Sequence, residues 1–320
     1  MRNSGLDYLK FGMALMVIGI HCASIGYHSE LWGVLTAQGL FRVAVPVFFI
    51  INGYYLYDSI RKGQATAIVS QLFMLFTCWQ LIYLYFYADQ ALTQTDQFLT
   101  TLLLGYNHLW YLSALVVSVI AVYFIRRGST RQLSYWAVSL YLFGVLLQYG
   151  TNYQWLPMEN GYLYFRSALF FGIPFVLIGF LLRREGISRL PGRFPLLWLL
   201  GALSLLVIEA ALNYQQHQQV VGYDLPLSAL LAAPVLFLWA LGLPSVSSGR
   251  SRLYSQMATT IYLIHPWFNY LLHLLNVPQG SIGKYAGSVL GSMAAAYLYL
   301  LFQQLLSKWQ RATLSTDRVS

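Results

Sequence analysis

The sequence predicts an all-α fold, a polytopic membrane bundle of about ten transmembrane helices with both termini in the cytoplasm. Three observations predict it. The 320 residues are 58% hydrophobic and only 9% charged, whereas soluble domains carry about 25% charged residues. The chain divides into apolar runs of about 20 residues, the length that crosses the hydrocarbon core of a bilayer. The basic residues between these runs follow the bias of cytoplasmic loops.

Ten apolar segments are predicted to cross the membrane, and residues 1–320 are predicted to form a single integral membrane domain. The segments lie at 9–27, 40–58, 67–88, 107–125, 133–150, 166–182, 195–213, 227–244, 255–275 and 285–306. The stretch 98–112 can instead form a short re-entrant segment before the fourth span. We expect no cleavable signal and no further soluble domain, because the first apolar run has the character of a retained span.

The distribution of lysine and arginine supports this topology. With the N-terminus in the cytoplasm, 16 of the 19 basic residues fall on the cytoplasmic side, leaving Arg42, Arg166 and Lys284 on the other. Short loops of membrane proteins show this bias, and one missed or extra helix would destroy it. The formal net charge of +9 therefore reflects topology, and nucleic-acid binding is not expected.

The first span carries ionisable side chains, which cost on the order of 3 kcal/mol near the centre of a bilayer. Lys10 and His21 are three helical turns apart, so they share one face of the helix at a separation of about 16 Å. Asp7 lies one turn before Lys10 and can pair with it. Histidine accepts and returns a proton near neutral pH, so His21 is a candidate general base. An interhelical hydrogen bond and a helix-end anchor also explain His21 and Lys10.

Later spans add polar residues to the same candidate site. Arg42 begins the second span at a depth similar to that of His21, and it can stabilise an oxyanion or extend to the interface. Asn52 adds polar atoms to that helix. Glu209 in the seventh span is a candidate partner for a buried cation or an interfacial carboxylate. The segments NHLWYL and IYLIHPWF supply four more pocket candidates: His108, Trp110, Tyr111 and His265. No residues show metal-ligand spacing, so no metal is expected.

Four segments together resemble acyltransferase family 3, the multi-spanning acyl-CoA-dependent O-acyltransferases. They are LDYLKFGMALMVIGIH, FRVAVPVFFIINGYYL, HLWYL and YLIHP, which follow one another in this order along the whole chain. The resemblance implies that His21 is the essential histidine of the first helix. It also implies that Lys10 stands where many members have arginine, and that Arg42 and His265 match further site residues of the family.

The chain departs from the family pattern at two places. Asn52 stands where members have the serine of a Ser-Gly pair, and the third span lacks the clustered arginines of many members. Arg61 and Lys62 are then the substitute ligands for the coenzyme, together with Lys10.

The resemblance implies a membrane O-acyltransferase, most commonly an O-acetyltransferase, of the bacterial inner membrane. Such an enzyme moves an acyl group from cytoplasmic acyl-CoA, commonly acetyl-CoA, to a hydroxyl of a cell-surface glycan or its lipid-linked precursor. The expected partners are therefore acyl-CoA, a saccharide acceptor and membrane lipid. His21 would deprotonate the hydroxyl and Arg42 would stabilise the oxyanion. A route through an acyl-histidine is also open.

Two other functions fit the same residues. A transporter or flippase for a lipid-linked sugar or small solute would use intramembrane His, Arg and Glu as a proton or substrate pathway. It would need no acyl-CoA. The third candidate is the membrane module of a racemase or a sensor, for which a further domain would be expected.

Overall fold

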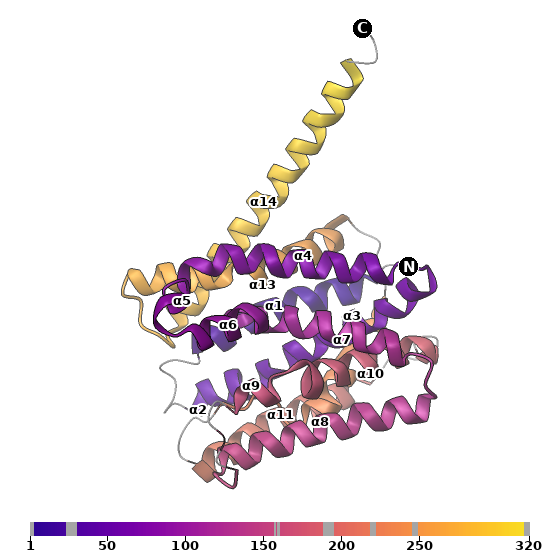
Figure 1. Cartoon of the computed structure of the whole chain (residues 1–320), viewed down its shortest axis with the longest axis vertical. Coiled ribbons are helices and arrows are strands. Elements are labelled where there is room, and N and C mark those ends of the chain that lie inside the picture. Colours follow the sequence, from indigo (N-terminus) through magenta and orange to yellow (C-terminus); the bar gives the residue numbers. More distant parts are fainter. Residues whose placement is uncertain are drawn as a thin grey trace.

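The structure is a computed structural model that describes residues 3–23, 31–156, 158, 161–187, 195–217, 222–244 and 249–316. Within these residues every regular element is a helix, which confirms the all-α prediction. Most of the long helices lie side by side in one bundle, and α14 leaves it at an angle (Figure 1). Helices satisfy their backbone hydrogen bonds internally, as a lipid environment requires.

All ten predicted segments coincide with helical stretches, apart from residues 24–27 of the first, which lie outside the described residues. The main helices are α1 (Ser4–Ala23), α3 (Ala44–Arg61), α4 (Ala65–Tyr83), α7 (Trp110–Ile125), α8 (Thr130–Asn152), α10 (Ile173–Arg184), α11 (Leu196–His217), α12 (Ala229–Leu241), α13 (Gly249–Leu274) and α14 (Ile282–Thr316). The short elements are α2 (Leu31–Gly33), η1 (Val34–Gly39), η2 (Leu40–Val43), η3 (Leu84–Phe86), α5 (Gln90–Thr93), α6 (Thr95–Leu104), η4 (Asn107–Leu109), α9 (Tyr162–Phe165) and η5 (Ala168–Gly172).

Six helical stretches of the described chain are long and apolar enough to cross a membrane. They are Ser4–Cys22, Leu31–Arg61, Ala65–Phe86, Asn107–Ile125, Leu196–Gln216 and Ile282–Lys308. The multi-pass character of the protein thus rests on length and composition, while the count of ten crossings stays a prediction.

The stretch 98–112 divides into two helices. The short helix α6 ends at Leu104 and is followed by Gly105, whose φ of 101° belongs to a region that glycine favours. Asn107 follows with φ 46°, a left-handed conformation that asparagine tolerates better than most residues. The chain therefore forms a separate short helix here and enters α7 through a tight turn, while the re-entrant course of this segment stays a prediction.

Helices α3 and α10 approach each other closely at two glycines. A Cβ atom built on Gly53 would lie 2.0 Å from the carbonyl oxygen of Val176, and one on Gly179 would lie 2.0 Å from that of Ile50. Each glycine therefore faces the backbone of the other helix, as small residues do where membrane helices associate. Helix α3 also contacts α1 and α12, so it lies at the centre of the bundle.

Hydrogen bonds tie the connecting segments together at each end of the bundle. At one end an Arg184 guanidinium N–H donates to the carbonyl of Gly128 at 3.0 Å. At the other, the backbone N–H of Gly280 donates to the carbonyl of Cys22 at 3.0 Å. We call these the inner and the outer end, after the predicted topology. The Arg184–Gly128 bond joins two segments that were both predicted on the cytoplasmic side. Which end of the bundle faces the cytoplasm stays a prediction.

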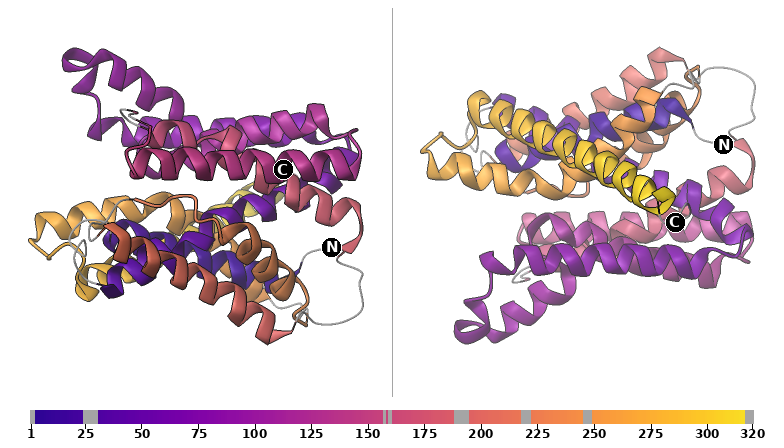
Figure 2. Two further views of the ribbon diagram at one scale, coloured as in Figure 1. Left: turned by 90° about the horizontal axis from the view of Figure 1, so that it is seen from below. Right: turned by 90° about the horizontal axis from the view of Figure 1, so that it is seen from above.

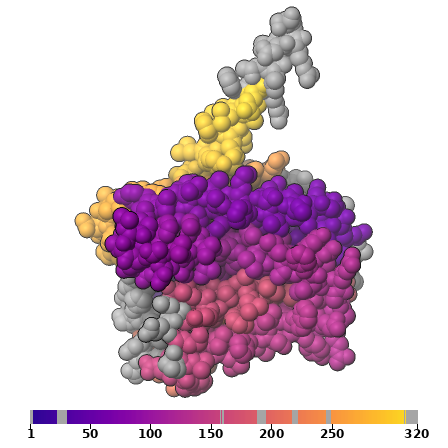
Figure 3. Space-filling view, in the orientation of Figure 1, coloured from indigo at the N-terminus to yellow at the C-terminus, as the bar shows by residue number. Residues whose placement is uncertain are grey.

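Helix α14 packs against α13 and α1 with its first part and then leaves the bundle (Figures 1 and 2). The space-filling view shows the later part standing out from the body (Figure 3). Its exposed side chains include Leu298, Phe302 and Leu305. Lipid is the solvent that suits this apolar surface.

Candidate active site

Three histidines predicted from the sequence form one cluster. The ring centroid of His265 lies 5.1 Å from that of His21 and 5.1 Å from that of His108, and the rings of His21 and His108 are 6.3 Å apart. They belong to α1, η4 and α13, and the packing of α1 on α13 brings two of them together. His108 and His265 are buried, whereas His21 is half-buried. His21 is thus the member of the cluster best placed to meet a substrate.

The orientation of His265 leaves an acceptor atom in the cluster. Its Nδ1 lies 2.7 Å from the carbonyl oxygen of Tyr262, and a carbonyl only accepts, so Nδ1 carries the proton. Nε2 is then an acceptor, and it has no hydrogen-bond partner among the described residues. Buried polar atoms without partners are rare in proteins and need an explanation. Here the orphan atom lies in the ring that packs beside His21.

His21 and Arg42, the two predicted catalytic residues, line one cavity of about 210 Å³. Arg42 is held by Gln38, whose side-chain oxygen accepts from Nε at 3.1 Å and also from Nη2, and by Asp224, which accepts from Nη1. A guanidinium carries five N–H donors. Three of them make these bonds, and the others remain for a ligand.

Asp224 joins Arg42 to a second arginine that was not among the predicted site residues. Nη2 and Nε of Arg166 donate to Asp224 Oδ2 at 2.6 and 3.0 Å, while Arg42 bonds Oδ1. Burial alone would raise the pKa of Asp224, but Arg166 and Arg42 hold it below its ordinary value. Two cations and one anion leave a net positive charge beside His21. Fixed charge of this kind stabilises negative charge that develops during a reaction.

Glu209 was predicted either to pair with a buried cation or to lie at the interface, and among the described residues no cation pairs with it. Its carboxylate accepts the backbone N–H groups of Leu227 and Ser228, both at 2.7 Å, and the hydroxyl of Tyr149 at 2.9 Å. These amides precede α12, and a carboxylate is favourable at a helix N-terminus. In the described part of the chain the buried cation Arg42 is paired by Asp224 instead.

Lys10, Asn52 and Tyr111 line a separate cavity of about 170 Å³ on the inner side. Asn52 Nδ2 donates to the hydroxyl of Tyr111 at 2.9 Å. Tyr262 lines the same cavity, and its ring lies 5.2 Å from the ring of His108. The cavity therefore leads from Lys10 toward the histidine cluster.

The other residues predicted on the inner side lie apart from the cluster. Arg61 and Lys62 are exposed where α3 ends, with the Arg61 guanidinium 5.9 Å from the ring of Tyr57. Neither lines the cavity of His21 and Arg42 or the cavity of Lys10. Asp7 is buried, and its pairing with Lys10 stays a prediction.

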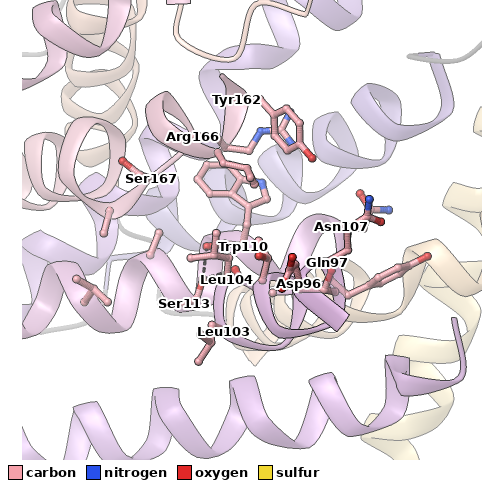
Figure 4. A pocket seen from close by; sticks show the side chains of 18 of the residues that line it. Asp96, Gln97, Leu103, Leu104, Asn107, Trp110, Ser113, Tyr162, Arg166 and Ser167 are labelled. Carbon is pink, nitrogen blue, oxygen red and sulfur yellow. Dashed lines mark hydrogen bonds between the residues drawn. The ribbon is translucent and has the colours of Figure 1, made fainter. Parts of the chain in front are cut away.

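A larger cavity, about 620 Å³, lies beside the cavity of His21 and Arg42. Figure 4 shows the rings of Trp110 and Tyr162 near Arg166, and Asn107 and Gln97 on the other side of the cavity. The guanidinium of Arg166 lies 5.7 Å from the Trp110 ring and 5.8 Å from the Tyr162 ring. Asn107, Trp110 and Arg166 line both cavities, so the two adjoin.

A fourth cavity, about 390 Å³, also reaches His21 and is lined by Lys284. The predicted topology left three basic residues outside the cytoplasmic segments: Arg42, Arg166 and Lys284. All three line cavities that include His21. Their departure from the charge bias was the sequence signal for Arg166 and Lys284. Asn107, which lines both of these cavities, had no comparable signal.

A family model described as an acyltransferase domain, that of acyltransferase family 3, matches residues 3–301. A serine/alanine racemase of Enterococcus gallinarum is 26% identical, over 89% of this chain and 44% of its own length. An amino-acid racemase of Enterococcus faecalis is 24% identical, over 99% of this chain and 48% of its own length.

The chain thus spans less than half the length of these curated relatives. No solved structure matches it. The family model, in contrast, covers nearly the whole chain and includes every histidine of the cluster and all three outer basic residues. This protein belongs to acyltransferase family 3.

Proposed function

We propose that this protein is a membrane O-acyltransferase that moves an acyl group from acyl-CoA to a hydroxyl of a saccharide, with His21 at the reacting centre. One observation carries the proposal: His21 lines two polar cavities, one with Arg42 and Arg166 and one with Lys284. Acyl transfer needs a base and a fixed positive charge at the point where two substrates meet. The family supports this class of reaction.

The proposed step is a direct transfer. A ring nitrogen of His21 takes the proton of the acceptor hydroxyl, and the oxygen attacks the thioester carbonyl carbon. The free N–H donors of Arg42 stabilise the oxyanion. The intermediate then expels the CoA thiolate, which takes the proton back from His21, so the products are an ester and CoA-SH. Nε2 of His265 is suited to accept a hydrogen bond from the protonated His21 ring and so to orient it.

The donor is proposed to approach through the cavity of Lys10. That cavity, about 170 Å³, is smaller than the roughly 300–1,000 Å³ usual for ligand pockets, so it must widen. Helix α4 is the element best suited to move, because its buried residues Phe76, Gln80 and Tyr83 all lie in its second half. The nucleotide end of acetyl-CoA or another acyl-CoA would then lie near Arg61 and Lys62, where its phosphates meet positive charge.

The acceptor is proposed to bind in the large cavity of Figure 4. Aromatic rings together with a few convergent polar groups form a typical small-molecule site. Trp110 and Tyr162 offer flat apolar surfaces to the faces of a sugar ring, and Gln97 and Asn107 offer amides to its hydroxyls. We propose a cell-surface glycan or its lipid-linked precursor, modified at the inner membrane of a bacterium.

A transporter or flippase is the alternative, since the same cavities would also admit a solute. The racemase names of the relatives describe proteins more than twice as long as the parts that match, so racemisation is not proposed for this chain. Dependence on acyl-CoA separates the two functions, because transport does not consume it.

Mass spectrometry of surface glycans tests the proposal. Cells that lack this gene would be complemented with the wild type or His21→Ala, with equal membrane levels and melting temperatures as controls. We expect an acyl group with the wild type and a loss of about 10²–10⁴-fold in transfer rate with His21→Ala, the usual contribution of a general base. Identical glycans with and without the wild-type gene would refute acyl transfer to them. Full acylation by His21→Ala would refute the mechanism alone.

A further inference from the structure

Lys284 is a buried cation with no anionic partner in the described residues. It lies in the first turn of α14, and only 1% of its surface is exposed. The ion pairs of the described residues involve Asp58, Glu185 and Asp224, and none of them includes Lys284. An unpaired charge inside a protein is strongly unfavourable, and buried charges are normally paired. An anion bound beside the ammonium would remove this cost.

The cavity beside Lys284 offers other groups that suit an anion. The Oδ1 atom of Asn269 accepts from the thiol of Cys22 at 3.0 Å and from Ser288, which leaves its NH₂ group for the cavity that it lines. His273 also lines the cavity, and its imidazole N–H can donate a hydrogen bond. No carboxylate side chain is among the described residues that line this cavity. Its lining therefore carries positive charge and several donors, beside the side-chain oxygen of Gln279, an acceptor without a partner among the described residues.

The position of the cavity points to the acceptor rather than the donor. It reaches His21 from the outer end, where the Gly280–Cys22 hydrogen bond lies, whereas the Lys10 cavity approaches from the inner side. Tyr106 and Asn107 line both this cavity and the large cavity of Figure 4, so the two cavities adjoin between the aromatic wall and Lys284.

We infer that the cavity of Lys284 binds an oxyanion of the acceptor, so that the acceptor is a saccharide with a carboxylate or a phosphate ester. The inference rests on the proposed function for the hydroxyl at His21. The Lys284 ammonium pairs with the oxyanion, and the amide of Asn269 donates a second hydrogen bond. Charge-assisted bonds of this kind are stronger than those between neutral groups. A neutral sugar would leave the ammonium unpaired and would bind less tightly.

Thermal melting of the purified full chain in detergent tests this without any acyl transfer. The probes are sodium glucuronate and sodium phosphate, with glucose and sodium chloride at matched ionic strength as controls. We expect glucuronate or phosphate to raise the Tm of the wild type in a saturable way and the controls to leave it unchanged. A response to glucuronate alone identifies a carboxylate, and one to phosphate alone identifies a phosphate ester.

Three variants assign the effect to Lys284. Lys284→Met should lose at least about tenfold in affinity for the anion, as expected for one charge-assisted contact. Lys284→Arg should retain binding, and Lys308→Met, which removes an exposed lysine of the same helix, should bind like the wild type. In buffer without the probes, Lys284→Met should melt no lower than the wild type, because it removes an unpaired buried charge.

Two results would overturn the inference: no anion-dependent shift in the wild type, or an equal shift in Lys284→Met. These outcomes are independent of the proposed function. Anion binding without acyl transfer would support the anion site and refute the proposed enzyme activity. Acyl transfer to neutral sugars without anion binding would support the enzyme activity and refute the anion site.

Discussion

The helix pair α3–α10 is closed at both ends by arginine and aspartate, but the two ends differ in burial. At the outer end, Asp224 is 7% exposed and bridges Arg42 and Arg166. At the inner end, Asp58 is 31% exposed and, among the described residues, pairs only with Arg183, at 2.7 Å. Between them, the contacts of the two glycines hold the helices together.

The difference indicates what each end does. Ion pairs that water reaches contribute little to stability, and the side chains of Asp58 and Arg183 are 31% and 29% exposed, whereas those of Asp224 and Arg42 are 7% and 10% exposed. In a buried ion pair, removal of one partner leaves the other charge buried and unpaired, which is strongly destabilising. The outer network thus fixes the position of two cations beside His21, whereas the inner pair can form and break with little consequence. Substitutions at four positions test this contrast.

Asp224→Asn should have the largest effect. It removes the negative charge that holds both arginines, and loss of one partner from a buried ion pair costs about 3–5 kcal/mol. We expect a clear fall in the Tm of the purified protein and loss of acyl transfer, since Arg42 would no longer be fixed. A variant that melts like the wild type would show that Gln38 alone is sufficient to hold Arg42.

Gly179→Ala should weaken the middle of the pair. The added methyl group would meet the carbonyl of Ile50 at 2.0 Å, so α3 and α10 must separate, and overpacking of this kind costs about 1–3 kcal/mol. Gly12→Ala in α1 is the matched control, because nothing lies within 4 Å of the added group. The control should be neutral or stabilising by up to about 1 kcal/mol. Equal melting of the two variants would contradict the close approach.

Asn107→Gly and Asn107→Ala distinguish the role of the Asn107 backbone conformation from that of its side-chain amide at the outer end. With φ at 46°, alanine should cost about 1–2 kcal/mol, whereas glycine adopts this conformation freely. If the amide contacts the acceptor, both variants should raise KM for it, and only Asn107→Ala should melt lower. Unchanged KM in Asn107→Gly would reduce the role of Asn107 to the turn.

The sequence was sufficient to predict the helices and the histidines but not the network around them. Apolar runs of membrane length locate helices well, because the bilayer sets that length. His21 and Arg42 could be found because ionisable groups are costly in lipid. Asp224 could not, since it lies in a connecting segment where carboxylates are ordinary. For Glu209 the sequence left a cation partner and an interfacial position open, and the backbone amides that it binds are visible only in the fold.

Asp58→Asn should have the smallest effect. Arg183 keeps a hydrogen bond to the hydroxyl of Tyr54 at 3.0 Å and lies 5.1 Å from its ring, and ion pairs that water reaches contribute only about 0–1 kcal/mol. The Tm should therefore change little, and acyl transfer should persist, because this pair is at the end away from His21. Measured beside Asp224→Asn, it compares one aspartate-to-asparagine change at two depths. A fall as large as that of Asp224→Asn would mean that burial does not distinguish the two ends, and that the inner pair also holds the site together.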